Sequence, residues 1–113
     1  MQLETRKYLF DIRQAAERIA RFCDGKSFDE YRGDELLRSA VERQFEIMGE
    51  ALSQLAKRDP EVAKRIKDHR KIMAFRNILI HAYATVDDRI VWGVVDGDLP
   101  ALRTSLMELL PDA

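Results

Sequence analysis

Cysteine, proline and glycine are scarce in this chain, and each scarcity narrows the possible folds. Cys23 is the only cysteine among 113 residues, which excludes an intrachain disulfide and a zinc site built on several cysteines. We interpret Cys23 as a small hydrophobic residue within a helix. Three prolines and five glycines interrupt the chain rarely, which favours long helices.

The sequence also lacks segments that would direct it to a membrane. Its first residues, MQLETRKYLFDIRQ, contain no uninterrupted apolar stretch like that of a signal peptide, and no run approaches the length of a transmembrane span. We therefore expect a cytoplasmic protein with no membrane association. Hydrophobic residues make up 46% and charged residues 35%, a composition typical of a folded chain, and we assign residues 1–113 to a single domain.

Charge is nearly balanced overall but unevenly distributed. The net charge of −1 provides no general attraction for nucleic acid. Residues 57–76, however, carry eight lysines and arginines against three acidic residues. A solvated helix face explains such a run more often than RNA binding does, so this segment supports an RNA-binding function only weakly.

Apolar residues recur at three- and four-residue steps, a spacing typical of amphipathic helices. The spacing predicts long helices over residues 3–23 and 35–57. Between them, Asp24-Gly25 ends the first helix with a glycine suited to a left-handed cap, and Ser27-Phe-Asp-Glu30 is a capping-box pattern that starts a short helix. The core positions expected on the long helices are Leu9, Ile12, Ala16, Ile19, Cys23, Leu37, Val41, Phe45 (or Gln44), Met48, Leu52 and Leu55.

The second half of the chain continues the helical pattern. Asp59-Pro60 predicts an N-cap followed by a proline in the first helical position, with a short helix to about residue 67. Further helices are expected over residues 70–84, from Asp87, and from Asp98-Leu-Pro100 onward. There is no strand-like alternation or internal repeat. The predicted fold class is therefore all-α, an antiparallel bundle of about five or six helices, two of them long.

The segment FRNILIHAYATVDD contains the polar residues best suited to chemistry, Arg76, Asn77, His81 and Tyr83. On a helix, Asn77 and His81 share a face because they are four positions apart, and Arg76 and Tyr83 nearly align at seven. Arg76 and His81 are five apart, which turns them about 140° away from each other. Either a break near His81 or a twofold dimer would direct both at one phosphate, and we favour the dimer.

Arg-x-x-x-x-His-x-Tyr, with an asparagine after the arginine, resembles the signature of HEPN-domain RNases. It is most similar to the HepT toxins of the MntA–HepT (nucleotidyltransferase–HEPN) toxin–antitoxin systems. The similarity extends to Gly49-Glu50-Ala51, Ile90-Val91-Trp92 and Asp98-Leu99-Pro100-x-Leu102, and thus covers most of the chain. That family often carries a tryptophan or proline before its motif helix, where this chain has the basic Lys67-Asp-His-Arg-Lys71.

The resemblance implies an endoribonuclease toxin of a type VII-like toxin–antitoxin pair, with Arg76 and His81 in the active site of a homodimer. It also implies a partner, a nucleotidyltransferase antitoxin similar to MntA. This partner would neutralise the toxin by transferring AMP to the motif tyrosine, Tyr83.

The residues themselves suit metal-independent RNA cleavage. Histidine titrates near pH 6.5, so His81 can act as base or acid, and the two copies in a dimer could divide these roles. The guanidinium of Arg76 matches phosphate oxygens and suits stabilisation of transition-state charge. Asn77 could orient His81 or the phosphate, and Glu50 could orient Arg76. The scheme requires no metal and no other cofactor.

Plainer interpretations of the same residues stay open. Arg76 could be a structural ion-pair partner of Glu46 or Glu50, and Tyr83 could simply bury its ring. Gly49 costs about 1 kcal/mol within a helix relative to alanine, which close approach of another backbone or of the motif helix would offset. Two further functions are a non-catalytic HEPN-type module, which binds a nucleotide or the nucleotidyltransferase, and a purely structural dimerisation bundle.

Overall fold

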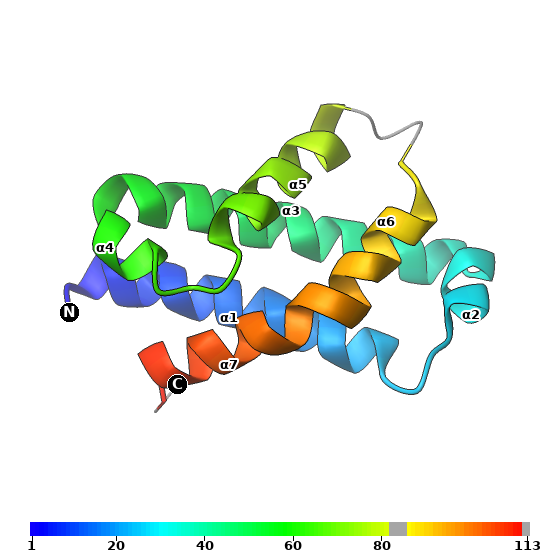
Figure 1. Cartoon of the computed structure of the whole chain (residues 1–113), viewed down its shortest axis with the longest axis horizontal. Coiled ribbons are helices and arrows are strands. Elements are labelled where there is room, and N and C mark those ends of the chain that lie inside the picture. Colours follow the sequence, from blue (N-terminus) through cyan, green and yellow to red (C-terminus); the bar gives the residue numbers. More distant parts are fainter. Residues whose placement is uncertain (82–85, 112–113) are drawn as a thin grey trace.

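The structure is a computed structural model that describes residues 1–81 and 86–111, and within these ranges it contains helices and no strand. The two long helices, α1 (Leu3–Cys23) and α3 (Glu35–Arg58), run antiparallel and form the most extensive contact in the fold (Figure 1). The helix α5 (His69–His81) packs on α3, and α7 (Leu99–Leu109) packs on α1. None of the helices described has both the length and the apolar character needed to cross a membrane. The predicted all-α bundle is confirmed.

The core lies between these helices and contains the apolar positions predicted for them. Phe45 occupies the central position on α3, and its ring packs edge-on against Phe75 with centroids 5.1 Å apart. Burial of each such side chain stabilises the fold by about 1.5–3 kcal/mol. Cys23 is buried as expected, and burial raises the pKa of its thiol. The stripe predicted for the long helices is buried, whereas Gln44 is only half-buried.

Local capping interactions set the ends of the first elements. Gly25 has a φ of 71°, the left-handed conformation predicted for it. The capping box at the start of α2 (Phe28–Gly33) is also confirmed, because the amide of Glu30 donates to Ser27 Oγ and the amide of Ser27 donates to Glu30 Oε1, both at 3.1 Å. Asp34 then caps α3 by accepting from an amide three residues on, at 3.0 Å.

The helix predicted over residues 60–67 is too long, since α4 (Pro60–Ala63) ends earlier. Its start is as expected, because the side chain of Asp59 caps it. After α4 the chain turns so that Ile66 is almost completely buried. Asp68 then adopts a φ of 60°, a left-handed conformation that aspartate tolerates better than most residues but that no helix continues through.

The C-terminal helices are continuous rather than separate. The helix α6 (Asp88–Gly93) leads directly into a π-helical segment, η1 (Val94–Asp98), and then into α7. In a regular helix, the ring of Pro100 would clash with the carbonyl four residues earlier, and the wider π-helical turn relieves that clash. Asp98 makes no side-chain cap at α7 and instead pairs with Lys71, Nζ to Oδ2 at 2.8 Å.

The helix predicted over residues 70–84 corresponds to α5, which begins at His69. The end of the predicted helix, residues 82–84, lies outside the described residues. Asp87 caps α6 as predicted, because its Oδ1 accepts from the amide of Arg89 at 2.8 Å.

Candidate functional site

The motif helix α5 approaches α3 very closely at Gly49. A methyl group on Gly49 would lie 2.4 Å from Arg76 Cβ and 2.8 Å from Arg76 Cδ, far inside van der Waals contact. The missing side chain therefore lets Arg76 lie directly over α3. This contact with the motif helix is one of the two close approaches expected to offset the cost of a glycine within the helix.

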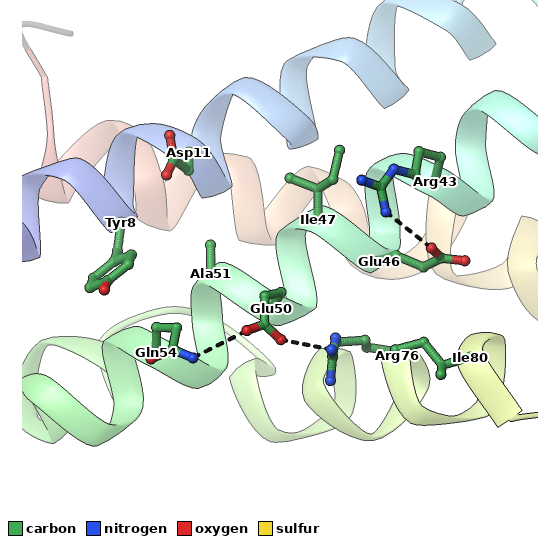
Figure 2. Close-up of a pocket in the computed structure, with 10 residues that line it drawn as sticks. All are labelled: Tyr8, Asp11, Arg43, Glu46, Ile47, Glu50, Ala51, Gln54, Arg76 and Ile80. Carbon is green, nitrogen blue, oxygen red and sulfur yellow. Dashed lines mark hydrogen bonds and ion pairs between the residues drawn. The ribbon is translucent and has the colours of Figure 1, made fainter.

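Glu50, the next residue on α3, holds Arg76 in an ion pair. Arg76 Nη2 lies 2.7 Å from Glu50 Oε2, and Gln54 Nε2 donates to Glu50 Oε1 at 3.1 Å (Figure 2). Arg76 Nε is buried and has no hydrogen-bond partner among the described residues. The guanidinium is thus positioned by α3 through one short contact, and part of its donor capacity is not used by the described chain.

This pairing answers one question that the sequence left open. The partner of Arg76 is Glu50, whereas Glu46 pairs with Arg43, Oε2 to Nη1 at 3.4 Å. The side chains of Arg76 and Glu50 are 25% and 51% exposed, and pairs this exposed contribute about 0–1 kcal/mol. Such a weak pair can rearrange around a phosphate, so the ion pair is compatible with phosphate binding.

Arg76 lies at the edge of a surface pocket of about 330 Å³. In Figure 2, α3 forms the floor of this pocket, α1 borders it on one side and α5 on the other. Tyr8 and Asp11 come from α1, Arg76 and Ile80 come from α5, and the remaining lining residues come from α3. The pocket therefore combines two arginines, three carboxylates, an aromatic ring and aliphatic side chains, a lining that suits a small ligand with both polar and apolar parts.

The other predicted site residues on α5 lie away from this pocket. Asn77 and His81 are both exposed, and neither lines it. An α-helix turns by about 140° over five residues, so His81 faces away from the side on which Arg76 meets α3. Within one chain, the structure brings Arg76 and Glu50 together and leaves His81 at the exposed end of α5. Tyr83, the predicted AMP acceptor, lies outside the described residues.

Five lining residues are not indicated by the sequence analysis, namely Tyr8, Asp11, Arg43, Ile47 and Gln54. Gln54 follows Glu46 and Glu50 at four-residue steps. This spacing places it on the same side of the helix as the two glutamates and could have identified it. For Tyr8 and Asp11 the sequence offers no signal, because nothing local shows that α1 borders this edge of α3. Within residues 1–81 and 86–111, no three His, Cys, Asp or Glu side chains gather closely enough to hold a metal ion.

Comparison with known proteins gives consistent matches. The sequence model of a family described as "Ribonuclease HepT-like" matches residues 12–109. A protein of Thermococcus cleftensis named "Probable ribonuclease HepT" is 35% identical over 112 residues, covering 96% of this chain and 98% of that protein. A "Putative RNase" of Caldanaerobacter subterraneus is 33% identical over 105 residues, covering 93% of each. No solved structure matches significantly.

The family match includes the positions that carry the sequence resemblance. Gly49, Glu50, Arg76 and His81 all fall within residues 12–109. The relatives align over nearly the whole length of both proteins, so the similarity is not confined to the motif. This chain belongs to the HepT-like ribonuclease family.

Proposed function

We propose that this protein, as a single domain of residues 1–113, is an endoribonuclease toxin that cleaves cytoplasmic RNA without a metal ion, with Arg76 and His81 as its catalytic residues. The observation that carries the proposal is the placement of Arg76. The guanidinium lies over α3 at the Gly49 contact, pairs with Glu50 through Nη2, and lines a pocket. Relatives named as ribonucleases support RNA as the substrate.

The proposed reaction is an internal transfer within the RNA. The 2′-oxygen forms a bond to the adjacent phosphorus, and the bond from phosphorus to the 5′-oxygen breaks. One His81 accepts the proton of the 2′-hydroxyl, and a second His81, from the other copy, donates a proton to the leaving 5′-oxygen. Arg76 stabilises the charge that develops on the non-bridging oxygens, while Asn77 supports His81 on the same face of α5.

A twofold dimer would place a histidine near the phosphate held by Arg76, which a single chain does not do. Arg76 faces α3, whereas His81 is exposed at the end of α5, so a second copy facing this helix can bring its own histidine to the phosphate. Ile78 on α5 is 48% exposed. This side chain offers apolar surface that such an interface would bury.

The basic segment of residues 57–76 supports RNA binding. Its lysines and arginines before Arg76 are all exposed. Arg58, Lys64 and Lys71 pair with carboxylates, at N–O distances of 2.7, 3.1 and 2.8 Å. No ion pair within the described residues involves the remaining four, which can contact RNA phosphates. These four residues are Lys57, Arg65, Lys67 and Arg70.

The test of this function is an RNA cleavage assay with purified protein in the presence of EDTA. We expect fragments that end in 2′,3′-cyclic phosphates and begin with 5′-hydroxyls, because the attacking group is the 2′-oxygen of the RNA. An oligonucleotide with a 2′-deoxy sugar at the cleaved position is the control and should stay intact. Cleavage that stops in EDTA, or that leaves 3′-hydroxyl ends, would contradict the mechanism.

The proposal includes neutralisation by a partner nucleotidyltransferase, similar to MntA, that transfers AMP to Tyr83. The support is the sequence, because Tyr83 follows Arg76 by seven positions, close to two turns of an α-helix. An adenylyl group would add bulk and negative charge near the guanidinium that binds the RNA phosphate. The modified tyrosine would therefore repel RNA and compete for Arg76.

Coexpression with such a nucleotidyltransferase should yield a Tyr83 peptide carrying at least one adenylyl group, as measured by mass spectrometry. The modified protein should lose RNA cleavage because its phosphate site is blocked. Tyr83→Phe should carry no adduct and should stay toxic in the presence of the partner. An adduct on Tyr8 or Tyr31 instead, or protection that persists in Tyr83→Phe, would refute this part of the proposal.

The alternative is a non-catalytic helical module that binds a nucleotide or the nucleotidyltransferase partner. The pocket beside Arg76 favours it, because nucleotide binding alone would explain both an arginine and an aromatic ring at that position. This alternative predicts nucleotide binding without RNA cleavage. It also predicts that expression without the partner is harmless, which separates the two functions in cells.

A further inference from the structure

We propose that the pocket beside Arg76 is a subsite for one nucleobase of the RNA, and that it selects bases with an exocyclic amino group over uracil. The inference rests on the proposed binding of an RNA phosphate at Arg76. It adds two residues of α1, Tyr8 and Asp11, which no sequence motif includes. Their proposed roles are to stack on the base and to read its edge.

The pocket has the position and lining that a base next to a bound phosphate requires. Arg76 forms part of its wall, so a phosphate held by the guanidinium places the adjoining nucleoside at the opening. The volume is about 330 Å³, within the size range of small-molecule sites. Ile47 and Ala51 contribute apolar surface from α3, and Ile80 contributes it from α5. These side chains can cover the flat faces of a base while its edge remains open to polar groups.

Tyr8 provides an aromatic face at the α1 side of the pocket. In Figure 2 its ring projects from α1 toward the side of the pocket where Gln54 lies. The side chain is half-buried, so part of the ring stays accessible. Stacking of a base on an aromatic side chain contributes about 1–3 kcal/mol and is insensitive to the identity of the base. Tyr8 therefore contributes affinity, and the preference must come from another group.

Asp11 is the group that can distinguish bases. Among the carboxylates of the pocket, Glu46 is paired with Arg43 at 3.4 Å. Glu50 is paired with Arg76 at 2.7 Å. Asp11 is half-buried, and no hydrogen bond or ion pair within the described part of the chain involves it. Its carboxylate is the lining acid left with unused acceptor capacity.

The chemistry of a carboxylate sets the direction of the preference. An ionised aspartate only accepts hydrogen bonds, so it favours base edges that present N–H groups. Cytosine presents its N4 amino group, and adenine and guanine carry amino groups as well. Uracil has a carbonyl oxygen where cytosine has its amino group, and that oxygen would face the carboxylate with no proton between them. Cytosine and uracil are therefore the closest matched pair for a test.

The experiment is an NMR titration of the full-length ¹⁵N-labelled protein with two uncleavable oligonucleotides, one of 2′-deoxycytidine and one of 2′-deoxyuridine, of equal length. We expect the cytosine oligonucleotide to bind about tenfold more tightly, with amide shifts at Ala51 and Gln54. Asp11→Asn should reduce this ratio to near one, because an amide donates as well as accepts. Asp24→Asn, at an exposed acidic residue after α1, is the matched control and should keep the wild-type ratio.

A second pair of variants tests the stacking role. Tyr8→Leu should weaken the binding of both oligonucleotides by a similar factor, about tenfold or more, since stacking does not depend on the identity of the base. Phe10→Leu replaces an exposed aromatic residue of the same helix that does not line the pocket, and it should change neither affinity. Unchanged thermal unfolding of each variant shows that the fold is intact.

Three outcomes overturn the subsite: equal wild-type affinities, a cytosine preference that survives Asp11→Asn, and shifts confined to residues outside the pocket. RNA cleavage is measured separately with the same proteins. If the protein binds the cytosine oligonucleotide in the pocket but cuts no RNA, the subsite is supported and the proposed nuclease activity is refuted. If it cuts RNA but fails the binding tests, the nuclease activity is supported and the subsite is refuted.

Discussion

Replacing His81 with alanine should reduce the rate of RNA cleavage by about a hundredfold or more, because a positioned acid or base contributes that much to a proton-transfer step. The side chain of His81 is exposed at the end of α5, outside the buried core. Its removal should therefore leave the unfolding temperature nearly unchanged. The loss should appear in kcat, with a smaller effect on KM, because the imidazole acts on protons that move only during the reaction.

His69 is the matched control for this variant. The chain has two histidines, and His69 begins the same helix at the end opposite His81. His69→Ala should cleave RNA at close to the wild-type rate. If instead His81→Ala cleaves at the wild-type rate and His69→Ala does not, the assignment of the catalytic histidine to His81 is wrong. If both variants cleave RNA at the wild-type rate, histidine takes no part in the mechanism.

Arg76→Ala should have an effect of similar size by a different route, since loss of one group that stabilises transition-state charge costs about a hundredfold to a thousandfold. Arg76→Lys should retain part of the activity, because lysine keeps the charge and loses the planar fork. The exposed pair with Glu50 is too weak for its loss to unfold the protein. An Arg76→Ala protein that is unfolded or fails to assemble, with no specific loss of cleavage, would favour the structural interpretation of this arginine.

Replacing Gly49 with alanine should lower the free energy of unfolding by about 3 kcal/mol, which for a domain of this size lowers the unfolding temperature by about 10 °C or more. The added methyl group would lie 2.4 Å from Arg76 Cβ. Both carbon atoms are attached directly to helix backbones, so no rotation of a side chain relieves the contact. The helices α3 and α5 must separate, and the contacts of Phe75 and Leu79 with the core weaken with them. Thermal or urea unfolding measures the loss.

Gly93→Ala is the control, because Gly93 is the last residue of α6 and a methyl group there meets nothing within 4 Å. That variant should be as stable as the wild type or more stable by up to about 1 kcal/mol, as expected when alanine replaces a helical glycine. The folded fraction of Gly49→Ala should also cleave RNA more slowly, since Arg76 is displaced from Glu50. Equal stability of the two variants would mean that α5 does not approach α3 as closely as the structure shows.

Much of the fold was predictable because the interactions that define it are local. The bounds of α1 follow from a repeat of apolar residues within the helix itself. The capping box of Ser27 and Glu30 and the caps of Asp34 and Asp59 join atoms no more than three residues apart. The left-handed turn at Gly25 is a property of glycine. The early end of α4 was not predictable from local spacing, since Ile66 lies beyond that end and belongs to a core formed by residues far apart in the sequence.

The candidate site, like the fold, was predictable from the sequence only in part. By itself, the sequence determined the helical elements and singled out Arg76, Asn77, His81 and Tyr83 by their types and spacing within one short segment. It could not choose between Glu46 and Glu50 as the partner of Arg76, because both lie on one edge of a helix, four residues apart. Only the tertiary structure decided this, since the contact at Gly49 fixes where α5 sits along α3. The packing of α1 beside α3 likewise placed Tyr8 and Asp11 at the pocket, because contacts between residues far apart in the sequence form only when the whole core assembles.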